Sequence, residues 1–140
     1  MRRYLIVANQ TLGSHQLQAR VAAYMAAGTT RFYIVVPATP SSEHLTWTHG
    51  EARAVAGRRL EAGLEQLRAM GADVAGEVGD GSPMLAVGDA LRSGDFDAIL
   101  LSTHAPGVSR WLRQDLPARM RRAFRLPIEH IAAGAEQLVA

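Results

Sequence analysis

The side chains best suited to chemistry stand together in one short stretch, Asp97 to Pro117. The stretch opens with an apolar run, Ala98 to Leu101, that is typical of a buried strand, and a polar turn follows. The hydroxyl, imidazole and guanidinium groups that come next belong to Ser102, Thr103, His104, Arg110 and Arg113. A turn that joins a strand to a helical segment is a common anion-binding site in α/β proteins. We therefore expect any ligand site to lie here.

Each of these groups has a structural interpretation beside the functional one. Hydroxyls at the end of a strand can face a ligand, but they also bond local backbone groups. His104 can donate to an anion when it is protonated. Arg110 and Arg113, three positions apart, share a helix face and can clamp a phosphate, or they can pair with Asp115 and solvent.

The same residues give little support to catalysis. No set of serine, histidine and aspartate is evident, the pattern Gly-x-Ser-x-Gly is absent, and the chain has neither cysteine nor lysine. His44 and His49 stand near Glu43 and Glu51, but their spacing matches no standard set of metal ligands. We expect no metal, no catalytic residue and no enzymatic activity.

The composition predicts one domain of ordinary size. The chain has 140 residues, of which 48% are hydrophobic, and this is enough for a single core. We expect one α/β domain over residues 1–140, with residues 133–140 as a tail that is at most partly ordered. The apolar run near the start is too short for a signal peptide, and no stretch approaches a membrane span. We expect a cytoplasmic protein with no membrane partner.

The charge gives no reason to expect nucleic acid as a partner. All the basic side chains are arginine, and the formal net charge is only +2. A basic face near the end of the chain is made by Arg119, Arg121, Arg122 and Arg125. We interpret this face as solvated, with an acidic partner or nucleic acid as the alternative.

Apolar runs alternate with segments of helical period along the whole chain. The runs that suit buried strands are Tyr4 to Ala8, Phe32 to Val36, Val74 to Val78, Ala98 to Leu101 and Ile128 to Ala132. A strand, helix, strand pattern therefore repeats four times. This repeat predicts a parallel sheet with helices on both faces.

Capping residues mark the expected helices. The starts are indicated by Ser14, by Thr48 with Glu51, by Ser82 before Pro83, and by Pro117, and the first three helices stop at Gly28, Gly71 and Gly94. The expected inner faces are Leu17, Val21 and Tyr24 or Met25; Val55, Leu60, Leu64 and Leu67; and Leu116, Met120 and Phe124. The irregular stretch Pro37 to Thr48 is expected to be a surface loop.

The order of elements and two short motifs resemble the universal stress protein family. The motifs are Gly-Val-Ser-Arg-Trp-Leu at Gly107 to Leu112 and Leu-Pro-Ile-Glu-His-Ile at Leu126 to Ile131, and the similarity extends from about Tyr4 to Ile131. The resemblance implies a doubly wound, five-stranded parallel sheet of order 3-2-1-4-5 with four helices. It implies a ligand site where the first and fourth strands diverge. It also implies a homodimer through the last strand, Ile128 to Ala132.

The sequence departs from the glycine motif of the ATP-binding members. When Gly107 is placed on the conserved loop glycine, the other three motif glycines fall on Leu101, His104 and Gln114, and the motif serine falls on Asp115. Bulky side chains there keep backbone amides away from phosphate. A carboxylate about 4 Å from a phosphate repels it by roughly 4 kcal/mol, although it is a good helix cap. We expect ATP binding to be weakened or lost.

The resemblance and the turn together give one set of candidate ligand-binding residues. They are Ala8, Asn9, Val36, Gly79, Ser102, Thr103, His104, Gly107, Ser109, Arg110 and Arg113. Asn9 falls where the family has an acidic residue at the end of its first strand. Gly79 opens a corner, with Asp80 and Gly81, that in the family approaches a ribose and that is equally typical of a turn.

The expected function is that of a non-enzymatic universal stress protein-like domain, acting by binding and dimerisation in stress response or regulation. A sensor of ATP or another adenine nucleotide is the first alternative, with Arg110, Arg113 and loop amides holding a small anionic ligand. The second alternative is a small hydrolase or nucleotidyl transferase of related fold. It would need His104 or Asp80 as its base.

Overall fold

The computed structural model describes residues 1–39, 49–104 and 110–133, without the side chains of His49, Arg110 and Arg113. The strands are β1 (Arg2–Val7), β2 (Thr30–Pro37), β3 (Val74–Gly79), β4 (Ala98–Thr103) and β5 (Ile128–Ala132). The helices are α1 (His15–Ala27), α2 (His49–Ala69), α3 (Pro83–Ser93), α4 (Arg110–Arg113) and α5 (Leu116–Ala123). The four expected helices correspond to α1, α2, α3 and α5, and α4 is a single turn just before α5.

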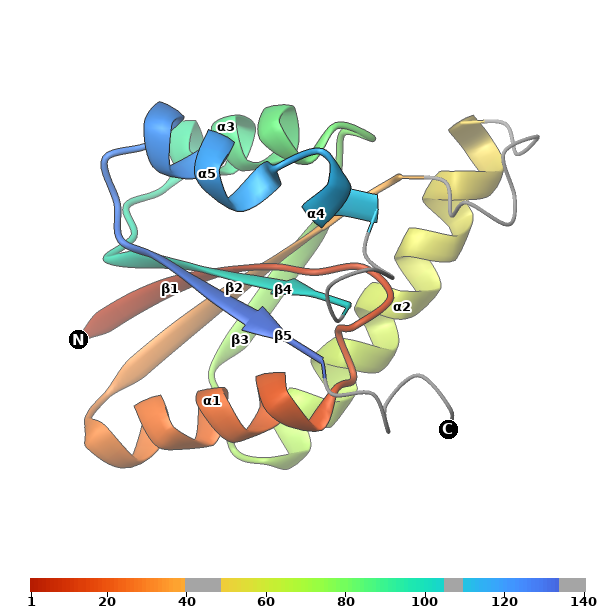
Figure 1. Ribbon diagram of the computed structural model, residues 1–140. Helices are drawn as coiled ribbons and strands as arrows, with labels where there is room; N and C mark the ends of the chain where they lie inside the picture. The colour runs from red at the N-terminus through yellow and green to blue at the C-terminus, as the bar shows by residue number, and fades with distance from the viewer. Residues whose placement is uncertain (40–48, 105–109, 134–140) are drawn as a thin grey trace.

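The strands form one parallel sheet in the order β3-β2-β1-β4-β5. Helices α1 and α2 cover one face, and α3, α4 and α5 cover the other (Figure 1). The predicted fold class and strand order are therefore confirmed. The chain leaves β1 toward one face and β4 toward the other, so the ends of these two neighbouring strands form the switch point.

Alternating side chains of the buried strands supply two cores. Tyr4, Ile6 and Ala8 point to the face that α1 and α2 cover, whereas Leu5 and Val7 point to the face of α3 and α5. Because both faces are covered, the central strands β1, β2 and β4 carry continuous apolar runs rather than an alternation of apolar and polar residues. This is why these three runs are the clearest in the sequence.

Capping explains where the helices begin and end. The Ser14 hydroxyl accepts the Leu17 amide at 3.2 Å, and the Ser82 hydroxyl accepts the Leu85 amide at 3.4 Å. Gly71, after α2, has a φ of 91°, a conformation that favours glycine. These three predictions are confirmed, whereas the cap predicted at Thr48 lies outside the described residues.

Some details differ from the expectation. Ala52 and Ala56 take the buried positions at the start of α2, and Val55 is only half-buried. The expected surface loop begins later, because Pro37 is the last residue of β2 and Ala38 is buried beside it. Residues 40–48 lie outside the described part of the chain.

Asp115 also differs in detail from the expectation. It precedes α5 as expected, but its side chain makes no cap bond. Its backbone is left-handed, with a φ of 56°. The Asp115 carboxylate is therefore exposed to solvent and does not close the first turn of α5.

Two glycines provide a matched test of the packing between α2 and the sheet. A Cβ atom at Gly76 of β3 would lie 2.7 Å from the Ile34 carbonyl oxygen and 2.8 Å from the Leu60 side chain, whereas one at Gly57 of α2 would meet nothing within 4 Å. Gly76→Ala is expected to lower the free energy of unfolding by about 1–3 kcal/mol. Gly57→Ala is expected to raise it by about 0.5–1 kcal/mol, because alanine favours a helix interior. Urea unfolding followed by circular dichroism measures both, and equal effects would contradict this packing.

Candidate functional site

Asn9 lies at the switch point, two residues after the end of β1, and is buried. Its amide nitrogen donates to the Pro37 carbonyl at 2.7 Å, at the end of β2. Its amide oxygen accepts a hydrogen bond from the Arg59 guanidinium, which comes from α2. Both ends of the Asn9 amide are therefore occupied, and the side chain ties together β1, β2 and α2.

Arg59 is the residue at this site that the sequence reasoning missed. Its side chain is half-buried, and burial lowers the pKa of its guanidinium, with a smaller contribution from the neighbouring Arg58. The ion pairs within the described residues involve Arg20, Arg31 and Arg92, so no described carboxylate pairs with Arg59.

A spacing signal for Arg59 exists in the sequence. Arg59 follows Ala52 by seven positions and Ala56 by three, and it precedes Gly63 by four, so it continues the inward-facing row of α2. All three of these small neighbours are buried. An arginine within a row of small buried residues indicates a side chain that reaches across the end of the sheet.

His104 directly follows β4 and contacts Gln10, the residue after Asn9. Its Nε2 atom bonds to the side-chain oxygen of Gln10, which makes Nε2 the protonated nitrogen in the neutral ring. Its Nδ1 atom is buried and has no partner among the described residues. Burial, followed by the positive charge of Arg59, lowers the pKa of His104, so the ring is neutral near pH 7.

The two hydroxyls at the end of β4 are engaged inside the protein. Ser102 is fully buried and shares a 2.7 Å hydrogen bond with Thr11. Thr103 donates to the His104 carbonyl at 2.8 Å and lies 2.7 Å from Nε2 of His130. Since the single Thr103 proton goes to the carbonyl, His130 is the donor in the second bond. Thr103 is only 2% exposed and its hydroxyl proton is already in use, so the pair does not form an activated nucleophile.

The remaining candidates fall into three groups. Ala8 and Val36 are core residues that can reach a ligand only through their backbone. Gly79 packs against α3, since a Cβ there would lie 2.8 Å from Ala86. Gly107 and Ser109, and the side chains of Arg110 and Arg113, lie outside the described part of the chain.

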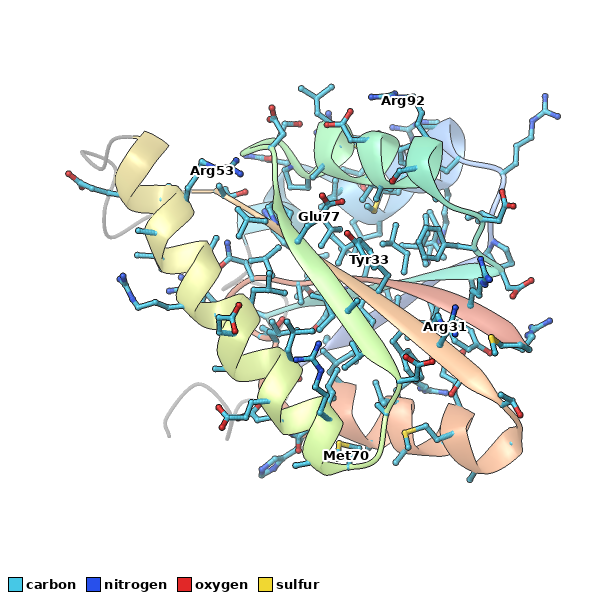
Figure 2. All side chains as sticks on the ribbon, turned by 180° about the vertical axis from the view of Figure 1, so that it is seen from behind. Arg31, Tyr33, Arg53, Met70, Glu77 and Arg92 are labelled. Carbon is cyan, nitrogen blue, oxygen red and sulfur yellow. The ribbon has the colours of Figure 1, made fainter. Side chains whose placement is uncertain are left out.

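The corner after β3 is built as a turn and a helix cap. The Asp80 carboxylate accepts a hydrogen bond from the Ser82 amide at 2.8 Å. This bond holds Ser82 in place as the N-cap of α3. Arg53, at the start of α2, donates weakly to the Gly79 carbonyl at 3.5 Å (Figure 2). In the same view Tyr33 and Glu77 lie close together on β2 and β3, where burial and then this carboxylate raise the pKa of the Tyr33 hydroxyl.

The predicted basic face is exposed, and its members are Arg119, Arg121, Arg122 and Arg125. Arg121 also donates to the Ile128 carbonyl at 3.4 Å. No group of three metal-ligating side chains meets within the described ranges, which exclude Glu43 and His44. None of the described helices is long and apolar enough to cross a membrane.

β5 is the edge strand of the sheet, and its outer side has no partner strand among the described residues. The Ile99 amide bonds to the Pro127 carbonyl and the Ala133 amide to the Thr103 carbonyl, so alternate backbone groups of β5 face β4. The amides of His130 and Ala132 therefore point away from the sheet. An open groove of about 410 Å³ runs between this strand and α1. It is lined by Gln16, Ala19, Arg20, Ala23, His130, Ile131 and Ala132.

The chain is similar in structure to a universal stress protein from Archaeoglobus fulgidus. The TM-score is 0.63 and the sequence identity 15%, over 94% of this chain and 93% of that one. No family model matches the sequence, and no curated protein matches it either. The structural similarity confirms the universal stress protein-like fold.

Proposed function

We propose that this chain is a non-enzymatic, cytoplasmic domain of the universal stress protein type. It acts by binding and by pairing with a second copy, in stress response or regulation, and its ATP binding is weakened or lost. The observation that supports this most is the occupied switch point. Groups that a nucleotide would have to engage there are already bonded to the protein.

The weak affinity for ATP follows from three features of the site. The Asn9 amide is bonded at both ends, and the Ser102 and Thr103 hydroxyls are bonded within the fold. A nucleotide gains little from groups that must first break their own hydrogen bonds. The exposed carboxylate of Asp115 at the start of α5 adds repulsion to a polyphosphate.

The proposed homodimer rests on the open edge of β5. A parallel edge strand with unpaired amides is a template for another chain. A two-fold pairing of β5 with its copy would satisfy the outward groups of both strands at once. Gln16 lines the adjoining groove, so this residue lies next to the surface that the second copy would cover.

The non-enzymatic role is supported by the contacts of the candidate bases. The Asp80 carboxylate is used in a turn, and the described hydrogen bond of the His104 ring is to the neutral Gln10 amide rather than to a carboxylate that would orient it as a base. Turnover of a nucleotide or ester that disappears in His104→Ala or Asp80→Ala, without loss of folding, would overturn this part of the proposal.

Isothermal titration calorimetry with ATP tests the proposal. We expect no saturable heat up to about 1 mM ATP, which corresponds to a binding free energy weaker than about −4 kcal/mol. Saturable binding at micromolar ATP, abolished by Arg110→Ala, would instead establish the adenine nucleotide sensor. A variant that exchanges Asp115 for serine is the matched gain-of-function control, because it removes the repelling carboxylate from the motif position.

A further inference from the structure

We propose that Arg59 and His104 form a binding site for a ligand with a single oxyanion group, such as a carboxylate or a monophosphate. This inference rests on the proposed binding role. It names the class of ligand that would bind at the switch point. It introduces a residue of α2, Arg59, that the glycine motif does not include.

The first argument is the unbalanced charge of Arg59. The guanidinium is half-buried, and its bond within the described residues is to the neutral amide oxygen of Asn9. A half-buried charge has lost part of its hydration, and a counter-charge offsets that loss. A guanidinium has five N–H donors, and one amide oxygen leaves most of them available. An oxyanion supplies both the charge and the acceptors.

The second argument is the free nitrogen of His104. Its Nε2 atom is held by Gln10, so the ring cannot turn without losing that bond. The buried Nδ1 atom has no described partner. In the neutral ring Nδ1 accepts a hydrogen bond from the O–H group of a monoprotonated ligand, and in the protonated ring the Nδ1–H group donates to an anion.

The positions of the two side chains bring these arguments together. Arg59 bonds to Asn9 and His104 bonds to Gln10, so the guanidinium and the imidazole attach to consecutive residues at the end of β1. Their charges interact, since Arg59 contributes to the lowered pKa of His104. An anion between them would offset the lost hydration of the Arg59 guanidinium and give Nδ1 of His104 a hydrogen-bond partner.

The site suits one anionic group rather than several. Among the described side chains, Arg59 is the cation whose charge reaches His104, and the neighbouring Arg58 is exposed. A carboxylate or a monophosphate matches the planar fork of one guanidinium. A triphosphate carries more charge than this single arginine balances.

Nuclear magnetic resonance of the labelled full chain provides the test. Sodium phosphate and sodium acetate are titrated separately at constant ionic strength, and the Nε–Hε signal of Arg59 and the ring signals of His104 are followed. We expect saturable shifts at both residues, and a rise in the pKa of His104 when the anion is bound. The two salts show whether phosphate or carboxylate is preferred.

Three variants make the test specific. Arg59→Gln is expected to weaken anion binding by about 10- to 100-fold, the usual cost of losing a charge-assisted hydrogen bond. Arg58→Gln removes the same charge from the same helix and is expected to change the affinity by less than about twofold, because exposed charges are screened. Asn9→Asp gives Arg59 an internal counter-ion and is expected to abolish binding while Arg59 is still present.

Two results would overturn the inference. One is the absence of saturable shifts with either salt in a folded sample. The other is an equal loss of affinity in Arg58→Gln and Arg59→Gln, which would indicate diffuse electrostatics. Both are distinct from failure of the proposed function, which is measured by ATP titration and by the oligomeric state of the same sample.

Discussion

Replacing Phe32 with alanine is expected to lower the free energy of unfolding by about 3–5 kcal/mol, a large part of the 5–15 kcal/mol typical of a domain. Phe32 is fully buried in β2 and stacks on Tyr4 of β1, with ring centroids 5.6 Å apart. Tyr4 in turn stacks on Tyr24 of α1 at 4.2 Å. The substitution therefore removes one end of a three-ring stack that joins two strands and a helix.

The consequences of Phe32→Ala extend toward β5. The Tyr24 hydroxyl donates to the Glu129 carboxylate, which also pairs with Arg20 at 2.7 Å. Burial, followed by Glu129, raises the pKa of Tyr24 to about 12. If the cavity loosens the stack, the pKa of Tyr24 will fall toward its ordinary value in the variant.

Urea unfolding and an alkaline absorbance titration of tyrosine measure these two effects. Leu85→Ala is the control, because Leu85 is 58% exposed and its truncation is expected to change the free energy of unfolding by less than about 0.5 kcal/mol. A loss below about 1 kcal/mol for Phe32→Ala would mean that the stack is not a principal part of the core.

The elements of this fold were predictable because they depend on local patterns. Five apolar runs became five strands, and Ile128 to Ala132 was predicted to the residue. The inner face of α2 was predicted less well. Alanine is only weakly apolar, so the sequence pattern favours Val55 as an inward-facing residue. In the structure Ala52 and Ala56 are the buried residues.

The contacts at the candidate site were not predictable, because they join residues far apart in the sequence. The bond between Arg59 and Asn9 depends on how far a long side chain reaches from α2 across the end of β1. The bond between Thr103 and His130 depends on the register of β4 and β5, in which Thr103 lies opposite Ala132. Sequence periodicity fixes which face a residue takes, but not its partner on another element.

The proposed dimer through β5 can be tested by removing a single backbone amide hydrogen from this strand. The Ala132 amide points away from β4, whereas the Ala133 amide donates to the Thr103 carbonyl at 2.8 Å. Proline has no amide hydrogen and is tolerated in a sheet where that hydrogen faces outward. Ala132→Pro should therefore keep the fold and remove an outward amide hydrogen that the proposed dimer would use.

We expect Ala132→Pro to weaken the homodimer by about 5- to 150-fold. Two-fold symmetry removes the same hydrogen bond twice, and each is worth about 0.5–1.5 kcal/mol. Sedimentation equilibrium of the two proteins measures the dissociation constants directly. Ala133→Pro is the matched control, because it breaks the bond to β4 and should lower the free energy of unfolding by about 1–3 kcal/mol. A wild-type chain that stays monomeric at high concentration would refute the dimer. Equal dissociation constants for wild type and Ala132→Pro would indicate that the dimer interface does not include β5.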